Sequence, residues 1–590
     1  MSHPRKSRIH SRRLVALALG ASMALLAALL AAQAPATAGP APGGNEVRPY
    51  APHEDEGPDI AAPKSHSPSR VPAKNVPRVA GLPVTGAHGV TTRIDGLTLK
   101  DQRTSNGGNS FSLEPPDQGL CVGSGQVIES VNNVFSIYST GGQKISNTQS
   151  FDPFWNNGTP EIVRHPDGTA TYGPFVSDPK CYYDPQLGRF FMTQLQLGTH
   201  PGTGNFTGDS FENIAVSKTS TPTTSSADWY IYRLNVRNDG TQGTPDHPGC
   251  PCLGDQPLIG ADRYGFYVST NEFPIFGAGF NGAQIYAFDK TALANGTKKV
   301  QRIEQVNPPL AEGVAYSVQP ATSPTADQWS NEAGGTEYAL SALEFTGGFD
   351  NRVAAWGLTN TSSLATATPN VHLSHTVIGS EVYGVPPQVE QKAGPTPQAD
   401  ALHAKENLLA SNDDRMNQVV YAGGRLWSGL NTAVKTPQYH VTAGIAYFVV
   451  HPSASSTTGV SASMANQGYV AATGQSTVFP AIGVNPDGTG VMTFTLSGKR
   501  YFPTAAIVHL GSSGAVTSGI ERIANGAVPA DGFTGYPAYG GNGVERWGDY
   551  SAAVADSAGN VWVATEYIPG TFGYPDFLAN WGTYVASVRP

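Results

Sequence analysis

The stretch DYSAAVADSAGNVWVATE at residues 549–566 begins with an acid, turns at its midpoint and ends with a second acid 17 positions later. The same layout recurs in DQPLIGADRYGFYVSTNE at 255–272 and, with an amide in place of the second acid, in DRMNQVVYAGGRLWSGLN at 414–431. An antiparallel hairpin folded at its midpoint brings its first and last residues side by side. The repeat therefore predicts one hairpin used several times, with a polar pair at its open end.

Four further segments extend this series of hairpins. Units beginning at Asp117 and Asp178 follow the pattern, and a third begins with Phe479 in place of the acid. A weaker unit runs from Tyr316 to Glu344. The seven starts are unevenly spaced, which is typical of propeller blades with loop insertions and not of a solenoid.

The sequence therefore predicts an all-β fold, a seven-bladed β-propeller over residues 88–590. The segment 88–99 is expected to supply the fourth strand of the last blade and to close the ring, which removes exposed sheet edges. Six or eight blades, or two β-sandwiches, are the alternatives. The composition agrees with many short strands, because only 14% of residues are charged while 68 are Gly and 46 are Pro.

The N-terminal region predicts export. Residues 1–38 combine a basic start, an apolar run and a small-residue cleavage site, so they are expected to be a signal peptide. Arg12-Arg13 allows twin-arginine export as an alternative to the general secretory route, and a retained membrane anchor is another alternative. Residues 39–87 are expected to be a Pro-rich disordered linker. We therefore expect a secreted, extracellular protein whose mature chain does not insert into a membrane.

The charge and the cysteines narrow the range of partners. The net charge of −9, with no basic block after the N-terminus, argues against nucleic-acid binding.

An even number of cysteines in an exported chain favours disulfides. We expect Cys121 to pair with Cys181, since each follows the first aspartate of its hairpin by three or four residues, and Cys250 to pair with Cys252. The alternative is a metal site formed by Asp246, His247, Cys250 and Cys252, although Cys-x-Cys is not a standard zinc spacing.

Several of these segments resemble a known group of proteins. SDPKCYYDPQLGRFFMTQLQL, GDQPLIGADRYGFYVSTNEF and RWGDYSAAVADSAGNVWVATEYI are similar to repeats in uncharacterised secreted bacterial proteins with propeller-like repeats. The resemblance implies export and a β-propeller fold, and it implies no activity. The chain is more remotely similar to sialidase-type propellers. Their Ser-x-Asp-x-Gly-x-Thr-Trp box is absent from this sequence.

The repeat also predicts where a site would lie. The start of a blade's first strand and the end of its second share one rim of the channel, and a concave mouth with convergent polar groups is the default site. The residues expected there are Asp117, Asp178, Asp255, Asp414, Asp549, Asn132, Asn271, Glu272, Asn431 and Glu566. The aspartates also suit a structural role as latches that accept backbone N–H groups. The variable strand ends are the better candidates for function.

Three chemistries would suit such a rim. Asp117, Asp178 and Asp414 offer the hard oxygen ligands that Ca²⁺ prefers, although no cofactor is required by the sequence. Glu272 and Glu566 are the pair that a glycan-cleaving hydrolase or lyase would need as catalytic carboxyl groups.

The third chemistry is non-catalytic binding of a glycan or peptide, with aromatic rings packed against the ligand. The residues that would bind it are Asp255, Asn271, Asn431, Asp549, Tyr550 and Tyr567. Packing between blades is the structural alternative for the aromatic residues, which include Phe273 and Trp547. We favour extracellular ligand recognition at the acidic rim, with the glycoside hydrolase-like enzyme and a purely structural interaction protein as alternatives.

Overall fold

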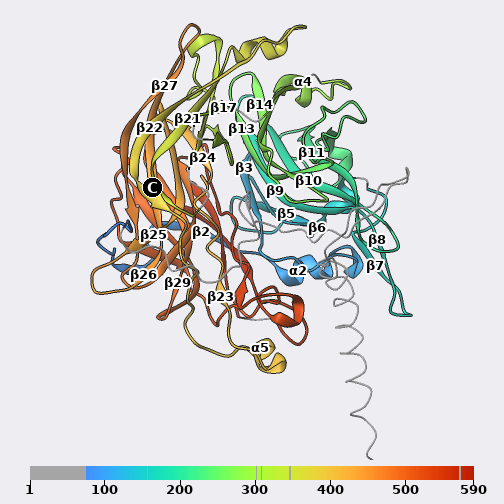
Figure 1. The fold of residues 1–590 in the computed structure, drawn as a ribbon, viewed down its shortest axis with the longest axis vertical. Coiled ribbons are helices and arrows are strands. Elements are labelled where there is room, and N and C mark those ends of the chain that lie inside the picture. Colours follow the sequence, from blue (N-terminus) through green and yellow to red (C-terminus); the bar gives the residue numbers. More distant parts are fainter. Residues whose placement is uncertain are drawn as a thin grey trace, which may run out of the picture.

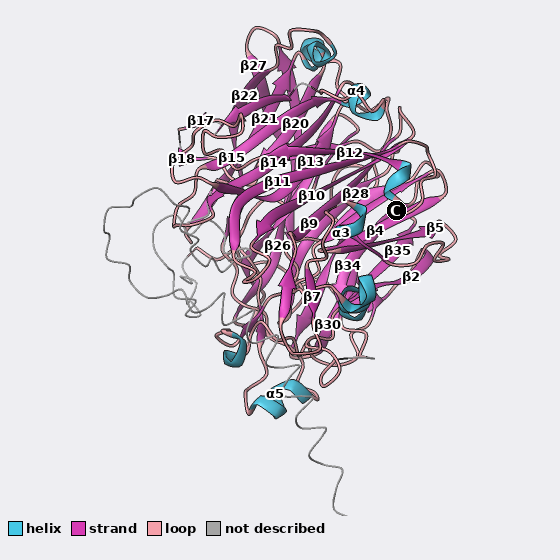
Figure 2. Cartoon of the chain, turned by 90° about the vertical axis from the view of Figure 1, so that its right-hand side faces the viewer, coloured by secondary structure: helices cyan, strands magenta, loops and turns pink. Residues whose placement is uncertain are grey.

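The computed structural model describes residues 75–155, 157–300, 302–306, 309–311, 313–343, 347–570 and 573–590. The expected signal peptide, most of the expected linker and Glu344 lie outside these residues. Strands dominate the described chain, and its helices are short and peripheral (Figure 2). The α-helices are α2 (Leu99–Thr104), α3 (Phe151–Phe154), α4 (Lys290–Ala294) and α5 (Pro397–Leu402). No helix among the described residues has the length and apolar character needed to span a bilayer.

Seven four-stranded antiparallel units make up the fold, and we number them as blades in chain order. Blade 1 consists of β3 (Gln118–Gly123), β4 (Gln126–Val131), β5 (Val134–Ser139) and β6 (Gln149–Ser150). Blade 2 consists of β9 (Phe175–Asp184), β10 (Arg189–Thr199), β11 (Phe206–Ser217) and β12 (Trp229–Asn235). Blade 3 consists of β13 (Cys252–Ala261), β14 (Gly265–Pro274), β15 (Gly282–Asp289) and β16 (Arg302–Val306). Blade 4 consists of β19 (Gln319–Thr322), β20 (Thr336–Ser341), β21 (Phe349–Thr359) and β22 (His372–Gly384). Blade 5 consists of β24 (Val419–Ala422), β25 (Arg425–Lys435), β26 (Val441–Ser455) and β27 (Gly459–Val470). Blade 6 consists of β28 (Ser476–Val484), β29 (Gly490–Gly498), β30 (Tyr501–Leu510) and β31 (Ile520–Ala524). Blade 7 consists of β33 (Ala552–Ala555), β34 (Val561–Tyr567), β35 (Gly582–Val588) and β2 (Val90–Thr98).

Shorter strands lie between and beside the blades. They are β1 (Val84–Gly86), β7 (Ile162–Arg164), β8 (Ala170–Tyr172), β17 (Pro309–Leu310), β18 (Gly313–Val314), β23 (Leu408–Leu409) and β32 (Val544–Glu545). Blades 4 and 5 join into one eight-stranded sheet, because the innermost strands β19 and β24 pair in parallel. In Figure 1, blades 2 and 3 lie on the right in teal and green, and blades 4 and 5 lie on the left in yellow and orange.

The innermost strands form a closed ring. In chain order each of β3, β9, β13, β19, β24, β28 and β33 contacts the next, and β33 returns to contact β3. The N-terminal strand β2 pairs antiparallel with β35, so the first and last strands of the ring share blade 7. The predicted seven-bladed propeller and its closing strand are confirmed.

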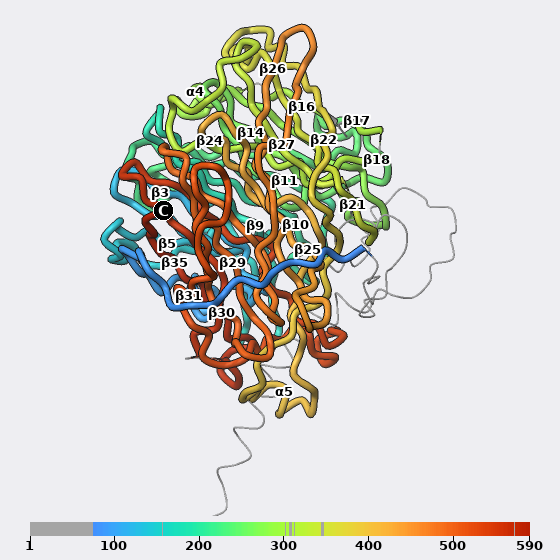
Figure 3. The backbone as a smooth tube through the Cα atoms, turned by 90° about the vertical axis from the view of Figure 1, so that its left-hand side faces the viewer, coloured from blue at the N-terminus to red at the C-terminus, as the bar shows by residue number. Residues whose placement is uncertain are grey.

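Residues 76–86, which the sequence analysis placed in the linker, lie along the outside of blades 5 and 6 (Figure 3). Val79 N donates to Lys435 O at 3.1 Å, and Leu82 N donates to Ala471 O at 2.8 Å. Strand β1 then pairs in parallel with β31, the outer strand of blade 6. This segment, which we call the strap, covers a sheet edge that would otherwise offer unpaired backbone groups.

An acid holds the hairpin turn in blades 2, 3 and 7. Asp556 Oδ1 accepts the backbone N–H groups of Ala558 and Asn560, both at 2.9 Å, and Asp556 Oδ2 accepts Trp562 Nε1–H at 2.9 Å. Asp262 holds the corresponding turn of blade 3 and accepts the Tyr267 hydroxyl at 3.1 Å. In blades 3 and 7 the turn acid thus also holds the aromatic side chain near the start of the second strand.

Two disulfides support the ring. Cys121 on β3 bonds Cys181 on β9 and so joins the innermost strands of blades 1 and 2, whereas Cys250 bonds Cys252 at the start of blade 3. Both pairings were predicted from the sequence. Disulfides are typical of oxidising compartments, so they agree with export.

Candidate ligand site at the central channel

The innermost strands carry a bulge where each enters the channel. Asp178, Gln256 and Phe479 each precede a proline and occupy matching bulges, with φ of 56°, 52° and 59°. Ser317 and Asp549 have the same left-handed backbone at the starts of their strands. A non-glycine residue in this region is strained and persists only where its surroundings hold it.

Asparagine side chains from the neighbouring blade hold two of these bulges. Asn271 Oδ1 accepts Ser317 N–H at 2.8 Å, and Asn431 Oδ1 accepts Phe479 N–H at 2.6 Å. Each bond runs from the second strand of one blade to the first strand of the next. The strand ends were predicted to be functional and the aspartates to be latches, but Asn271 and Asn431 are themselves latches between blades.

The five aspartates do not share one environment. Asp117 accepts hydrogen bonds from Asn132 Nδ2 and Ser177 Oγ, and Asp549 pairs with Arg546 Nη2 at 2.8 Å. Asp178 and Asp414 are buried, whereas Asp255 is half-buried. Asp255 is offset by one position from Asp178, because Gln256 occupies the equivalent bulge. The rim is therefore a packed polar layer and not an open ring of carboxylates.

Glu272 and Glu566, the predicted catalytic pair, belong to separate networks. Glu272 is bonded by Asn238 Nδ2 at 2.5 Å, by His247 Nδ1 at 2.8 Å and by Asn281 Nδ2 at 3.0 Å. Glu566 Oε2 accepts Gly548 N–H at 2.9 Å. Among the contacts of the described residues, none joins the two carboxyl groups.

Glu566 instead belongs to a group of buried acids that the repeat did not reveal. Burial raises its pKa well above the usual value, and the nearby charges of Glu545, Glu114 and Asp549 raise it further. Burial also raises the pKa of Glu114 to about 8 and that of Glu545 well above its ordinary range. Glu114 precedes blade 1 and Glu545 precedes blade 7, so only ring closure brings them together and no local pattern marks them.

The carboxylates proposed as calcium ligands do not assemble into a site. Across the described ranges, a single group of three potential ligand atoms lies within 4.8 Å, and it consists of Cys250, Cys252 and Glu272. Its two sulfurs are joined as a disulfide and offer no thiolate. Asp117, Asp178 and Asp414 are not part of any such group in this portion of the chain.

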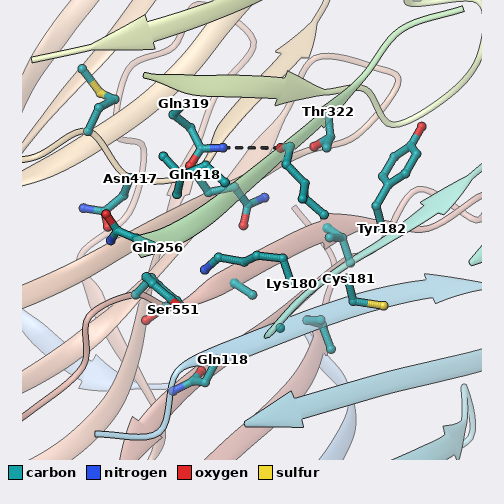
Figure 4. Close-up of a pocket in the computed structure, with 18 residues that line it drawn as sticks. Gln118, Lys180, Cys181, Tyr182, Gln256, Gln319, Thr322, Asn417, Gln418 and Ser551 are labelled. Atoms are coloured by element: carbon teal, nitrogen blue, oxygen red, sulfur yellow. Dashed lines mark hydrogen bonds between the residues drawn. The ribbon is translucent and has the colours of Figure 1, made fainter. Parts of the chain in front are cut away.

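Polar side chains from six blades line a cavity of about 60 Å³ in the channel (Figure 4). Gln118, Gln256, Gln319 and Gln418 reach it from different strands, and Lys180 extends between them. Gln418 is committed to structure, since its amide bonds both the N–H and the C=O of Ala553.

Gln118 is the distinctive member of this lining. Gln118 is 1% exposed, and among the described residues neither its Nε2 nor its Oε1 has a hydrogen-bond partner. Gln256 Oε1, by contrast, accepts Arg415 Nη1–H at 2.9 Å. A buried amide without partners costs about 1–3 kcal/mol, so Gln118 is a candidate for contact with a ligand. It lies one position after the predicted Asp117, so the spacing indicated the place but not the residue.

Of the two aromatic residues expected to bind a ligand, Tyr550 lines the channel cavity and Tyr567 packs inside the protein. Lys180 Nζ lies 2.7 Å from the centre of the Tyr550 ring, so one face of that ring is occupied. Tyr567 packs edge-on against Tyr584 at 5.6 Å between ring centres. Trp547 is buried in an apolar cluster and Phe273 stacks near Phe280. These contacts agree with the alternative of packing between and within blades.

Comparison with known proteins gives only weak likenesses. No protein-family model and no curated protein matches the chain. Among solved structures, the α-L-arabinofuranosidase of Fusarium graminearum is 10% identical, covers 85% of this chain and 98% of its own, and has a TM-score of 0.34. The endo-arabinase of Bacteroides thetaiotaomicron is 10% identical, and the match covers 70% of this chain and 93% of the endo-arabinase, with a TM-score of 0.26. Trypanosoma rangeli sialidase is 10% identical over 72% and 57%, with a TM-score of 0.30. At these TM-scores, the fold and the site rest on the geometry of this chain alone.

Proposed function

We propose that this protein is an exported β-propeller that recognises a hydroxyl-bearing glycan at its central channel. The observation that carries the proposal is the Gln118 amide, which is buried in the channel cavity and has no hydrogen-bond partner in the part of the chain that the structure describes. An amide offers two donors and an acceptor, which suits a hydroxyl group that can both donate and accept. Occupation of the cavity would remove the cost of the unpaired amide.

The size of the cavity limits how the ligand binds. Pockets that enclose small ligands usually measure about 300–1,000 Å³, whereas this cavity measures about 60 Å³. It has room for one substituent, such as a hydroxyl or hydroxymethyl group, and not for a whole sugar ring. The ligand is therefore expected to insert one group and to lie with its body across the channel mouth.

A glycan array probed with the exported protein tests the proposal. The Gln118→Leu variant removes the amide at similar volume and is expected to lose binding to any glycan that the native protein retains. Gln143→Leu, on an exposed turn, is the matched control and should bind normally. Equal binding by all three proteins would show that the channel is not the site, and the absence of any binding would exclude glycan recognition.

Hydrolysis of a glycan is the second candidate function, and one observation favours it. Burial raises the pKa of Glu114 to about 8, so this carboxyl group is protonated at neutral pH, as a general acid would be. Its partner would be Glu545 or Glu566 and not Glu272. Release of product from a panel of aryl glycosides, abolished in Glu114→Gln and Glu566→Gln, would support catalysis. Binding without turnover would leave recognition as the function.

A further inference from the structure

The Cys250–Cys252 disulfide lies in an environment that differs from that of Cys121–Cys181. Its two cysteines are only 2 positions apart in the sequence, whereas Cys121 and Cys181 are 60 positions apart. The stabilisation that a disulfide gains by restricting the unfolded chain grows with the length of the loop it closes. Restriction of the unfolded chain therefore gives Cys121–Cys181 a stabilising role, and it gives Cys250–Cys252 a much smaller one.

The two sulfurs of this short disulfide differ in access. Cys250 is half-buried at the base of an exposed loop, in which Asp246, Pro248 and Gly249 are all exposed. Cys252 is fully buried at the start of β13. An incoming thiolate can therefore approach the sulfur of Cys250, with the sulfur of Cys252 as the leaving group.

Polar side chains surround both sulfurs. Asn281 Nδ2 lies 3.7 Å from Cys250 Sγ and 3.6 Å from Cys252 Sγ. The amide can therefore donate a hydrogen bond to whichever sulfur becomes a thiolate. Glu272 Oε1 lies 3.8 Å from Cys250 Sγ and 2.8 Å from His247 Nδ1. The carboxylate and imidazole provide acid–base groups next to the reacting sulfur.

We propose that Cys250–Cys252 is a thiol–disulfide exchange site whose substrates are thiols. A substrate thiolate attacks Cys250 Sγ, forms a mixed disulfide with it, and expels Cys252 as a thiolate that accepts a hydrogen bond from Asn281. A second substrate thiolate attacks the substrate sulfur of the mixed disulfide and leaves Cys250 as a thiolate. The two substrate thiols are thereby oxidised to one disulfide, and the protein is reduced to a dithiol that takes up the two protons. Exchange of this kind depends on which sulfur is attacked and on access to it.

Treatment of the intact protein with reduced glutathione tests the proposal without any substitution. Mass spectrometry of the quenched protein should show a glutathione adduct on Cys250 while Cys121–Cys181 remains closed. An adduct on Cys252, earlier opening of Cys121–Cys181, or resistance of both disulfides would overturn the proposal.

Two variants test the assignment of the sulfurs and the role of Asn281. Cys252→Ser leaves Cys250 as a free thiol that iodoacetamide should alkylate at least tenfold faster than the Cys252 thiol of Cys250→Ser. Asn281→Ala should shift the pH midpoint of Cys250 alkylation upward in the Cys252→Ser background, because the thiolate loses a donor. Asn525→Ala, on an exposed loop, is the control. Equal alkylation rates would contradict the assignment of Cys250, and an unshifted midpoint would remove Asn281 from it.

Discussion

Replacing Glu129 with glutamine should make the protein more stable at pH 8 and nearly unchanged at pH 4.5. Glu129 on β4 of blade 1 accepts Leu97 N–H at 3.2 Å and also accepts the Thr583 hydroxyl, and both partners belong to or adjoin blade 7. Burial raises the pKa of Glu129 from 4.5 to about 7. The carboxyl group is thus a clamp at the point where the ring closes, and it is most favourable when protonated.

The magnitude and sign follow from proton linkage. The folded state holds the proton more tightly than the unfolded state, so the stability from this group is fully present below pH 4.5. It is lost as pH rises to about 7, and a difference of about 2.5 units corresponds to roughly 3 kcal/mol. Glutamine does not titrate, so the variant should gain about 3 kcal/mol over the native protein between pH 4.5 and 8.

Urea unfolding at pH 4.5 and pH 8 measures this difference. The other buried acids titrate in both proteins, so their contributions cancel in the comparison. Glu129→Ala should be destabilised at both pH values because Leu97 N–H and the Thr583 hydroxyl lose their acceptor. Gln143→Leu, on an exposed turn, is the control and should show no pH-dependent difference from the native protein. A stability difference between Glu129→Gln and the native protein that does not change with pH would refute the reasoning.

Three further changes test the architecture. Removal of the strap, residues 76–86, should lower the melting temperature, because it uncovers the edge of β31; calorimetry showing no shift would mean that the strap contributes nothing. Asn431→Ala should cost about 1–3 kcal/mol in urea unfolding, because Phe479 N–H and Ser411 C=O lose their buried partner, and an unchanged midpoint would contradict the latch. Asp556→Ala should cost a similar amount and alter the fluorescence of Trp562, whereas an unaltered spectrum would argue against the Asp556–Trp562 bond.

The repeat in the sequence predicted the ring because it is a local property. Hairpin length and turn position are set within each hairpin, and in blades 3 and 7 an acid, Asp262 or Asp556, holds the turn. Closure by residues 88–99 and the Cys121–Cys181 bond followed from aligning the hairpins. These inferences needed no knowledge of side-chain packing.

The site was predicted less well because it depends on register and on contacts between distant segments. A bulge at Gln256-Pro257 moves Asp255 one position away from the equivalent of Asp178, which no spacing rule reveals. Asn271 and Asn431 were expected to bind a ligand, but each accepts a backbone N–H of the next blade, 46 or 48 residues further along the chain. Burial of an amide such as Gln118 is likewise a property of the assembled channel.

The most direct measurement is the crystal structure of the exported protein with a glycan that it retains on the array. We expect a hydroxyl oxygen of the ligand in the channel cavity, within about 3 Å of Gln118 Nε2 or Oε1. A glycan bound elsewhere on the propeller, with Gln118 still without a partner, would contradict it.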